Sequence, residues 1–227
     1  MTPVEMELLA GSDEALLATL DAFKARYGIA GTDDDETILG ILRGVSARLA
    51  SDPACAGRSV AGAPALLKGE WTADLSPDAP SRRSLWLPAW PIVEVTEVLE
   101  AEDGAFGDAT PLVEDEDFQA DAAAGRLIRI GGYWLQGERT IRVQWTGGYT
   151  GPNEYLGAGY EAEAGEVRLP QDVQDACVQQ AGYAWQRRSS LGLSGASAGQ
   201  GSASWAAEDD LLPGVRETMK AYRRMMI

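Results

Sequence analysis

The sequence predicts an α+β protein in which N-terminal helices and a third helix pack on a small antiparallel β-sheet, with one more helix at the C-terminus. Three observations support this prediction. Apolar residues recur at helical spacing over 13–51 and again over 170–188. Between about residues 58 and 148 the period changes to two and turn residues recur, which indicates strands. An uncharged stretch rich in Gly, Ser and Ala then precedes a last helical pattern.

The first two helices are expected over residues 13–27 and 33–51. Acidic residues 33–36 favour a helix start, because the helix dipole places partial positive charge at the N-terminus. Pro53 closes the second helix. The apolar faces consist of Leu16, Leu20, Phe23 and Tyr27 in the first helix and Ile38, Ile41, Leu42, Val45 and Leu49 in the second.

The clearest strand runs from Thr140 to Thr146, where Ile141, Val143 and Trp145 alternate with polar residues. Such alternation predicts one buried face and one exposed face. Further strands are expected at Trp90–Val98 and Arg126–Ile130, with a short edge strand at Glu114–Phe118.

Residues 147–166 are rich in glycine and acidic residues and show neither the helical nor the strand spacing of apolar residues, so we expect a long loop. A third helix follows over 170–188. Its start at Leu169-Pro170 suits proline, whose missing N–H is not needed in a first helical turn. We therefore predict one domain over residues 1–190.

Residues 191–208 are expected to be a flexible tether, because Gly192–Ser204 has no charge and one large apolar residue, and so cannot offset its own ordering entropy. Residues 209–227 are then expected to form a docking helix. Its apolar residues fall at helical spacing and its other faces are basic. This helix has two interpretations: it packs back on its own domain, or the tether lets it reach another protein.

Composition excludes several classes of function. The net charge of −16 argues against tight binding of nucleic acid, which needs Lys and Arg to neutralise phosphates. The chain has no histidine, and so lacks both the usual proton-transfer group near neutral pH and the commonest metal ligand. The two cysteines, Cys55 and Cys177, predict buried thiols rather than a disulfide framework. We expect no cofactor and no metal.

No apolar run approaches the roughly 20 residues that a membrane span needs, and the acidic start lacks the basic region of a signal peptide. The sequence therefore predicts a protein that is made and kept in a cytoplasm, with no membrane partner.

Two patterns resemble sites. Gly195–Gly199 matches the G-x-S-x-G nucleophile elbow, but this motif needs a preceding strand, a following helix and a histidine base. Asp33–Asp35 lacks the ligand spacing of a calcium loop and is better explained by helix capping. Among the seven tryptophans, those without periodic context are candidates for a subunit interface, where large aromatic residues are enriched: Trp71, Trp134 and Trp205.

The order of these parts resembles the head-tail connector (adaptor) family of long-tailed bacteriophages and gene-transfer agents. The resemblance spans about residues 35–227. Four stretches carry it through their order and spacing: Leu87–Val98, Thr140–Tyr149, Leu169–Arg188 and Leu211–Arg224. The chain departs from the family at Gly214, where a helix former is usual, and in the long loop Gly151–Val167.

The resemblance implies a structural virion protein, not an enzyme. It would form a ring, commonly of twelve copies, below the portal at the head-tail interface, after assembly in the host cytoplasm. The partners it implies are the portal protein, neighbouring copies, downstream stopper or tail proteins, and genomic DNA that passes without tight binding. The C-terminal helix would order on the portal through Leu211, Leu212, Val215, Arg216, Met219, Lys220, Tyr222, Arg223, Arg224 and Met226. In the channel, repulsion from an acidic run would let DNA slide, with Glu114, Asp115, Glu116 and Asp117 facing it.

Two alternatives remain open. One is a tail-completion or stopper ring protein, which shares the ring contacts and lacks the portal-docking tail. The other is a hydrolase that uses two carboxylates, a chemistry for which the chain has enough acids but no distinctive pair.

Overall fold

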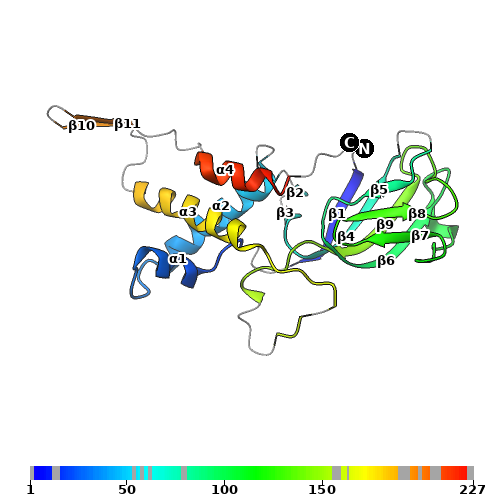
Figure 1. The fold of residues 1–227 in the computed structure, drawn as a ribbon, viewed down its shortest axis with the longest axis horizontal. Helices are drawn as coiled ribbons and strands as arrows, with labels where there is room; N and C mark the ends of the chain where they lie inside the picture. Colours follow the sequence, from blue (N-terminus) through cyan, green and yellow to red (C-terminus); the bar gives the residue numbers. More distant parts are fainter. Residues whose placement is uncertain are drawn as a thin grey trace.

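A computed structural model describes residues 3–11, 16–52, 55–56, 59–60, 63–77, 81–154, 160–162, 164–188, 195–198, 201–204 and 211–223. The molecule is elongated, with the helices at one end and the sheets at the other (Figure 1). The α+β class is confirmed. Within the described part of the chain, no helix is long and apolar enough to cross a membrane.

The helical end is built from α1 (Leu20–Tyr27), α2 (Asp35–Ser51), α3 (Gln171–Arg187) and α4 (Pro213–Lys220). All four helices contribute to one apolar core, and α3 packs against each of the other three. Phe23, Leu42 and Val173 are fully buried there. This core explains the helical periods in the sequence, since each apolar stripe faces the other helices.

The first helix begins later than predicted, at Leu20 instead of near residue 13. Thr19 caps it: the backbone is extended there, and the hydroxyl accepts a hydrogen bond from the Ala22 N–H at 3.0 Å. The preceding Leu17 is held by a bond from its N–H to the Ser46 hydroxyl on α2. Residues 12–15 lie outside the described residues.

The sheet end contains two antiparallel sheets. The larger has the strand order β1 (Pro3–Gly11), β4 (Gly69–Leu75), β9 (Ile141–Gly147), β6 (Ile92–Glu100). The smaller has the order β5 (Ser84–Trp86), β8 (Arg126–Arg129), β7 (Phe118–Asp121). Apolar side chains from both sheets form a second core, which includes Trp71, Leu85, Leu127 and Trp145. The shorter elements are β2 (Ser59–Val60), β3 (Ala63–Pro64) and the 3-10 helix η1 (Phe106–Asp108).

Strand β9 confirms the clearest strand prediction, because Ile141, Val143 and Trp145 are buried and the residues between them are partly exposed. The predicted edge strand Glu114–Phe118 is wrong. Residues 115–117 form a turn, and the strand β7 begins at Phe118. Sequence reasoning also missed β1, although Val4, Met6 and Leu8 alternate there with Glu5 and Glu7.

The two ends meet where β4 begins and β9 ends. Tyr149 lies in the helical core, and its backbone exchanges hydrogen bonds with Leu66 and Lys68. Gly148 makes this crossing possible: its φ is +110°, and an added Cβ would lie 2.2 Å from the Leu67 carbonyl oxygen. The long loop after it has no regular element over its described residues and is fastened by the ion pair Lys68–Glu166.

Within the predicted tether, Gly195–Ala198 and Gly201–Ser204 pair as an antiparallel hairpin, β10 and β11. Figure 1 shows this hairpin beyond the helical end of the molecule. The rest of 191–208 lies outside the described residues. A strand that pairs with a second strand is not the strand-turn-helix arrangement of a nucleophile elbow, so the G-x-S-x-G match does not have that geometry over its described residues.

Candidate functional site

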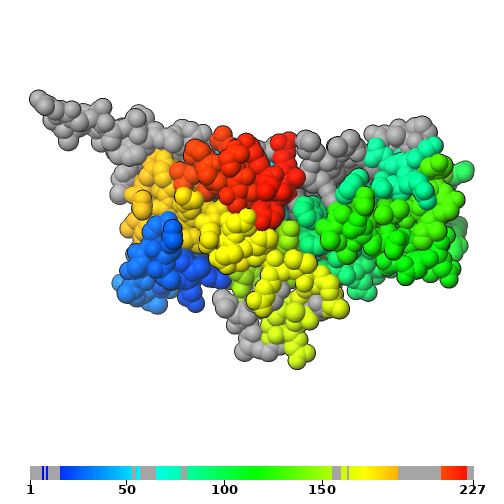
Figure 2. Space-filling model, viewed as in Figure 1, coloured from blue at the N-terminus to red at the C-terminus, as the bar shows by residue number. Residues whose placement is uncertain are grey.

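The C-terminal helix α4 packs on its own domain. Val215 and Met219 are fully buried and Leu211 is 4% exposed, all three in the helical core with α3. Figure 2 shows α4 lying alongside α3 on one face of the molecule. Of the two interpretations of this helix, the structure shows the first. A partner could contact these three side chains only after α4 left the core.

Polar contacts fix both ends of α4. The Leu212 N–H donates to the Gln180 side-chain oxygen at 3.0 Å, and the Tyr222 hydroxyl donates to the Asp172 carboxylate at 2.7 Å. The Tyr222 ring also lies edge-on to Tyr149, with centroids 6.2 Å apart. Burial and then the bond to Asp172 raise the pKa of Tyr222, so this hydroxyl stays protonated as a donor.

The residues predicted to bind the portal therefore fall into two groups. The apolar ones face inward, with Leu212 and Tyr222 only half-buried at the helix ends. The basic ones face outward: Lys220 and Arg223 are exposed and Arg216 is half-buried. Arg224 and Met226 lie outside the described residues.

The outward residues form a basic face on α4. Beneath it, burial and then the Asp52 carboxylate raise the pKa of the Cys55 thiol, while Arg216, Arg48 and Lys220 act in the opposite direction, so an acid lies among these cations. The Arg216 Nε is buried and has no hydrogen-bond acceptor among the described residues. Lys220 pairs with Glu217 at 2.7 Å on the surface, a contact worth little in water. On a chain of net charge −16, a concentration of positive charge favours an acidic partner.

The cysteines confirm the prediction of buried thiols, since Cys55 and Cys177 are free and fully buried. Burial raises the pKa of Cys55 to about 11 and that of Cys177 to about 12.

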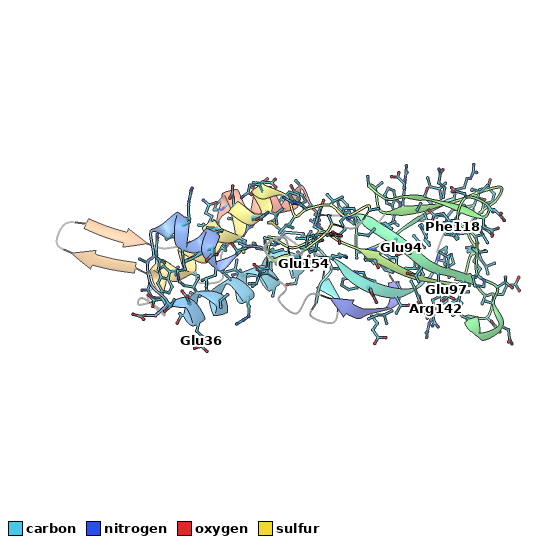
Figure 3. All side chains as sticks on the ribbon, turned by 90° about the horizontal axis from the view of Figure 1, so that it is seen from below. Glu36, Glu94, Glu97, Phe118, Arg142 and Glu154 are labelled. Carbon is cyan, nitrogen blue, oxygen red and sulfur yellow. The ribbon has the colours of Figure 1, made fainter. Side chains whose placement is uncertain are left out.

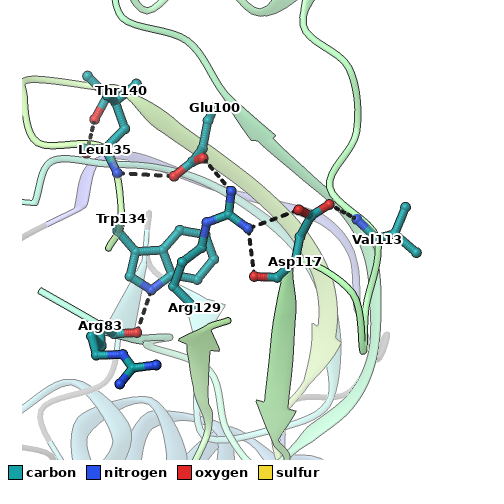
Figure 4. Close-up of polar contacts among 8 residues, drawn as sticks. All are labelled: Arg83, Glu100, Val113, Asp117, Arg129, Trp134, Leu135 and Thr140. Atoms are coloured by element: carbon teal, nitrogen blue, oxygen red, sulfur yellow. Dashed lines mark hydrogen bonds and ion pairs between the residues drawn. The ribbon is translucent and has the colours of Figure 1, made fainter. Parts of the chain in front are cut away.

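The acidic turn at 114–117 is held rigidly (Figure 4). The Asp117 carboxylate accepts the Val113 N–H at 3.0 Å and pairs with Arg129 at 3.3 Å. These contacts, the backbone bond first, lower the pKa of Asp117. Asp115 adopts a left-handed conformation with φ of +66°, which an extended strand does not allow. This conformation and the carboxylate cap explain why the predicted edge strand is a turn.

Arg129 connects this turn to the rest of the sheets. Its guanidinium also donates to Glu100 at 3.3 Å, and Glu100 accepts the Leu135 N–H at 3.1 Å (Figure 4). Four residues were predicted to face the channel. Of these, Asp117 is held by contacts within the domain, while Glu114, Asp115 and Glu116 are exposed.

The prediction of an interface role is wrong for two of the three tryptophans. Trp71 is 1% and Trp134 is 3% exposed, and both belong to the core between the sheets. Each ring N–H is satisfied by a backbone carbonyl, that of Gly147 for Trp71 and that of Arg83 for Trp134. The alternation of Trp71, Ala73 and Leu75 along β4 could have indicated burial of the first. Trp205 lies outside the described residues.

A charge cluster that the sequence did not predict lies on the outer face of the larger sheet. Asp74 on β4 is 4% exposed and accepts a bidentate pair of hydrogen bonds from Arg142 on β9, at 2.7 and 2.9 Å. It accepts two more from Arg139, at 2.8 and 3.3 Å. Burial favours the neutral acid, yet the two arginines lower the pKa of Asp74. The cluster depends on the register between β4 and β9, which places Asp74 opposite Arg142.

Carboxylates are spread over the length of the molecule. In Figure 3, Glu36 lies at the helical end, Glu154 in the middle, and Glu94 and Glu97 on the sheets. Glu97 accepts a hydrogen bond from Gln144, and Glu154 accepts the Gly151 N–H. Among the described residues, no group of three or more Cys, Asp or Glu is arranged to hold a metal ion.

No protein-family model matches the sequence, and no curated protein matches it. Solved structures do match. The fold is similar to that of a gene transfer agent neck protein. One chain from the neck of an empty gene transfer agent particle, computed with C6 symmetry, has a TM-score of 0.58 at 14% identity. A chain from the neck of a native particle, computed with C12 symmetry, has a TM-score of 0.57 at 17% identity. A chain from the native virion has a TM-score of 0.58 at 17% identity.

Each match covers 99% of this chain and 97% of the other. The likeness therefore extends over both ends of the molecule, helices and sheets together. At such identities it shows a shared fold.

Proposed function

We propose that this chain is a structural virion protein of the neck, which forms a ring below the portal, joins the DNA-filled head to the tail and lets DNA pass. The observation that supports this proposal is the match in fold over nearly the full length to chains of gene transfer agent necks. The C12 symmetry stated for one of these necks fits a ring of twelve copies. A ring closes through heterologous contacts, in which one face of each copy meets a different face of the next.

In this proposal α4 contributes its basic face to portal binding, while its apolar face remains in the core. Lys220 and Arg223 then contact an acidic portal surface directly, and Arg216 contributes from its half-buried position. Long-range attraction between opposite charges speeds such encounters and fixes the register of the ring.

Deleting the helix is a poor test, because deletion would expose the helical core. The better variant is Lys220→Glu with Arg223→Glu. Its matched control is Arg26→Glu with Arg83→Glu, which makes the same change in net charge at two exposed arginines elsewhere. Pull-down with purified portal protein should be lost for the first variant and kept for the second. Equal retention by both variants would remove α4 from the portal contact.

The exposed carboxylates Glu114, Asp115 and Glu116 line or rim the channel in this proposal and repel DNA. A ring reconstruction by electron microscopy tests their position. Turns that point away from the ring axis would end this part of the proposal.

The packing of α4 favours one alternative. A stopper or tail-completion ring needs no portal-docking tail, and in this structure α4 has its apolar face occupied. Particles assembled with a tagged copy of this chain distinguish the two roles. A ring in contact with the portal supports the connector role, and a ring separated from the portal by another protein supports the stopper role.

A further inference from the structure

An apolar groove lies between α2 and α3. It has a volume of about 250 Å³ and is lined by Ile41, Val45 and Ala184, with Tyr183 beside them and an arginine from each helix, Arg48 and Arg187. The apolar residues are all half-buried, so the groove opens to the surface.

The charge of this groove is unusual for the chain. Its lining contains two arginines and no carboxylate, although the whole sequence has 35 acidic and 19 basic residues. The groove between α1 and α3 includes Asp175, and the hollow on the outer face of the larger sheet includes Glu7 and Asp74. An apolar groove with a positive rim fits an occupant that is apolar and negatively charged.

The groove lies beside the start of α4. Gln180 lines the groove and accepts the Leu212 N–H at the start of α4, and Arg48 lines it on the α2 side. The groove therefore adjoins the first turn of α4.

Gly44 opens the groove further. It lies on α2 within the lining, and an added Cβ there would meet no atom within 4 Å. A partner backbone can approach α2 closely at this point.

We propose that this groove binds an acidic segment of the portal, whose large apolar side chains enter between α2 and α3 while its carboxylates meet Arg48 and Arg187. The inference rests on the proposed function and adds to it a second contact beside α4. Burial of apolar surface would then stabilise a contact that charge alone makes only weakly.

The experiment measures binding of the full chain to purified portal protein by biolayer interferometry. Ala184→Trp fills the groove, and Ala47→Trp adds the same ring to an exposed position on α2 outside the lining. Arg48→Glu reverses the rim charge, and Arg26→Glu makes the same charge change on α1. Thermal unfolding checks that each variant is folded, and Arg48→Glu carries the test if Ala184→Trp does not fold.

We expect Ala184→Trp and Arg48→Glu each to weaken binding by at least about tenfold, with both controls within about twofold of the unmodified chain. If the unmodified chain binds the portal and the groove variants bind equally well, the groove inference is overturned and the proposed function stands. If the unmodified chain does not bind the portal, the docking part of the proposed function is overturned together with the inference.

Discussion

Replacing Met219 by Ala decides whether α4 belongs to the folded domain. The side chain is 0% exposed and lies in the helical core, whereas a docking helix on a free tether would leave it without contacts in the isolated protein. Truncating a buried methionine to alanine costs about 2–5 kcal/mol, from lost burial and from the cavity that remains. Since α4 is short and lies at the edge of the core, the cavity can partly collapse, and we expect about 2–3 kcal/mol.

The assay is urea unfolding followed by far-UV circular dichroism, which reports on the helical end. With a slope of roughly 2 kcal/mol per molar urea, the midpoint should fall by about 1–1.5 M. The control is Lys220→Ala, one position further along the same helix, where an exposed ion pair with Glu217 is lost at a cost below about 1 kcal/mol. Alanine favours helix at both positions, so helix propensity does not explain a difference. If both variants unfold at the same midpoint, α4 is not packed as described, and the free docking helix is the correct interpretation.

Three further predictions follow from the sheets, the crossing between the two ends, and the thiols. Asp74→Asn should cost about 1–2 kcal/mol near pH 7, a value reduced because Arg139 and Arg142 are 42% and 36% exposed and regain water. The folded pKa of Asp74 lies below its unfolded value, so its contribution to stability is present above about pH 4 and is lost as the pH falls through the folded pKa. Urea titrations across this range should show the stabilities of the two proteins converging in acid. A constant difference in stability would contradict the role given to the ionised Asp74. Gly148→Ala should lower the free energy of unfolding by about 3 kcal/mol or more, because the added Cβ would overlap the Leu67 carbonyl. Gly40→Ala, in open space on α2, should instead raise it by about 0.5–1 kcal/mol. Thermal melts compare the two variants, and equal melting temperatures would refute the close approach at Gly148. Neither Cys55 nor Cys177, with pKa values of about 11 and about 12, should react with a maleimide near pH 8 until urea unfolds the helical end, and rapid labelling of the native protein would show that a thiol is accessible.

The helix and strand patterns were readable because each element buries one face. Ile38, Leu42 and Leu49 mark the inner side of α2, and Ile141, Val143 and Trp145 mark that of β9. Element ends were less predictable. The start of α1 at Thr19 differs from the predicted start near residue 13, and beside it the Leu17 N–H bonds to Ser46, a residue 29 positions away. The strand β1 was missed although its alternation was present, because its partner β4 lies far along the chain.

The charged residues divide in the same way. The excess of acids and the lack of histidine are properties of composition. Whether one carboxylate is exposed or structural depends on its partners. Glu114 and Asp117 look alike in the run, but Asp117 caps a turn and pairs with Arg129 from another strand. The ion pair of Asp74 could not be predicted from the sequence, because only the register of β4 and β9 places this residue opposite Arg142.

By itself, the sequence determined the α+β class, the positions of the long helices and the clear strand, the amphipathic character of the C-terminal helix, and the basic side that this helix presents. These follow from local periodicity and composition. Only the tertiary structure decided what the apolar side of that helix contacts. An apolar stripe specifies that something must cover it, and the same stripe fits a partner or its own domain equally well. Here α3 covers it, because Gln180 and Asp172 on that helix bond the two ends of α4 and the core leaves space for Val215 and Met219 between them.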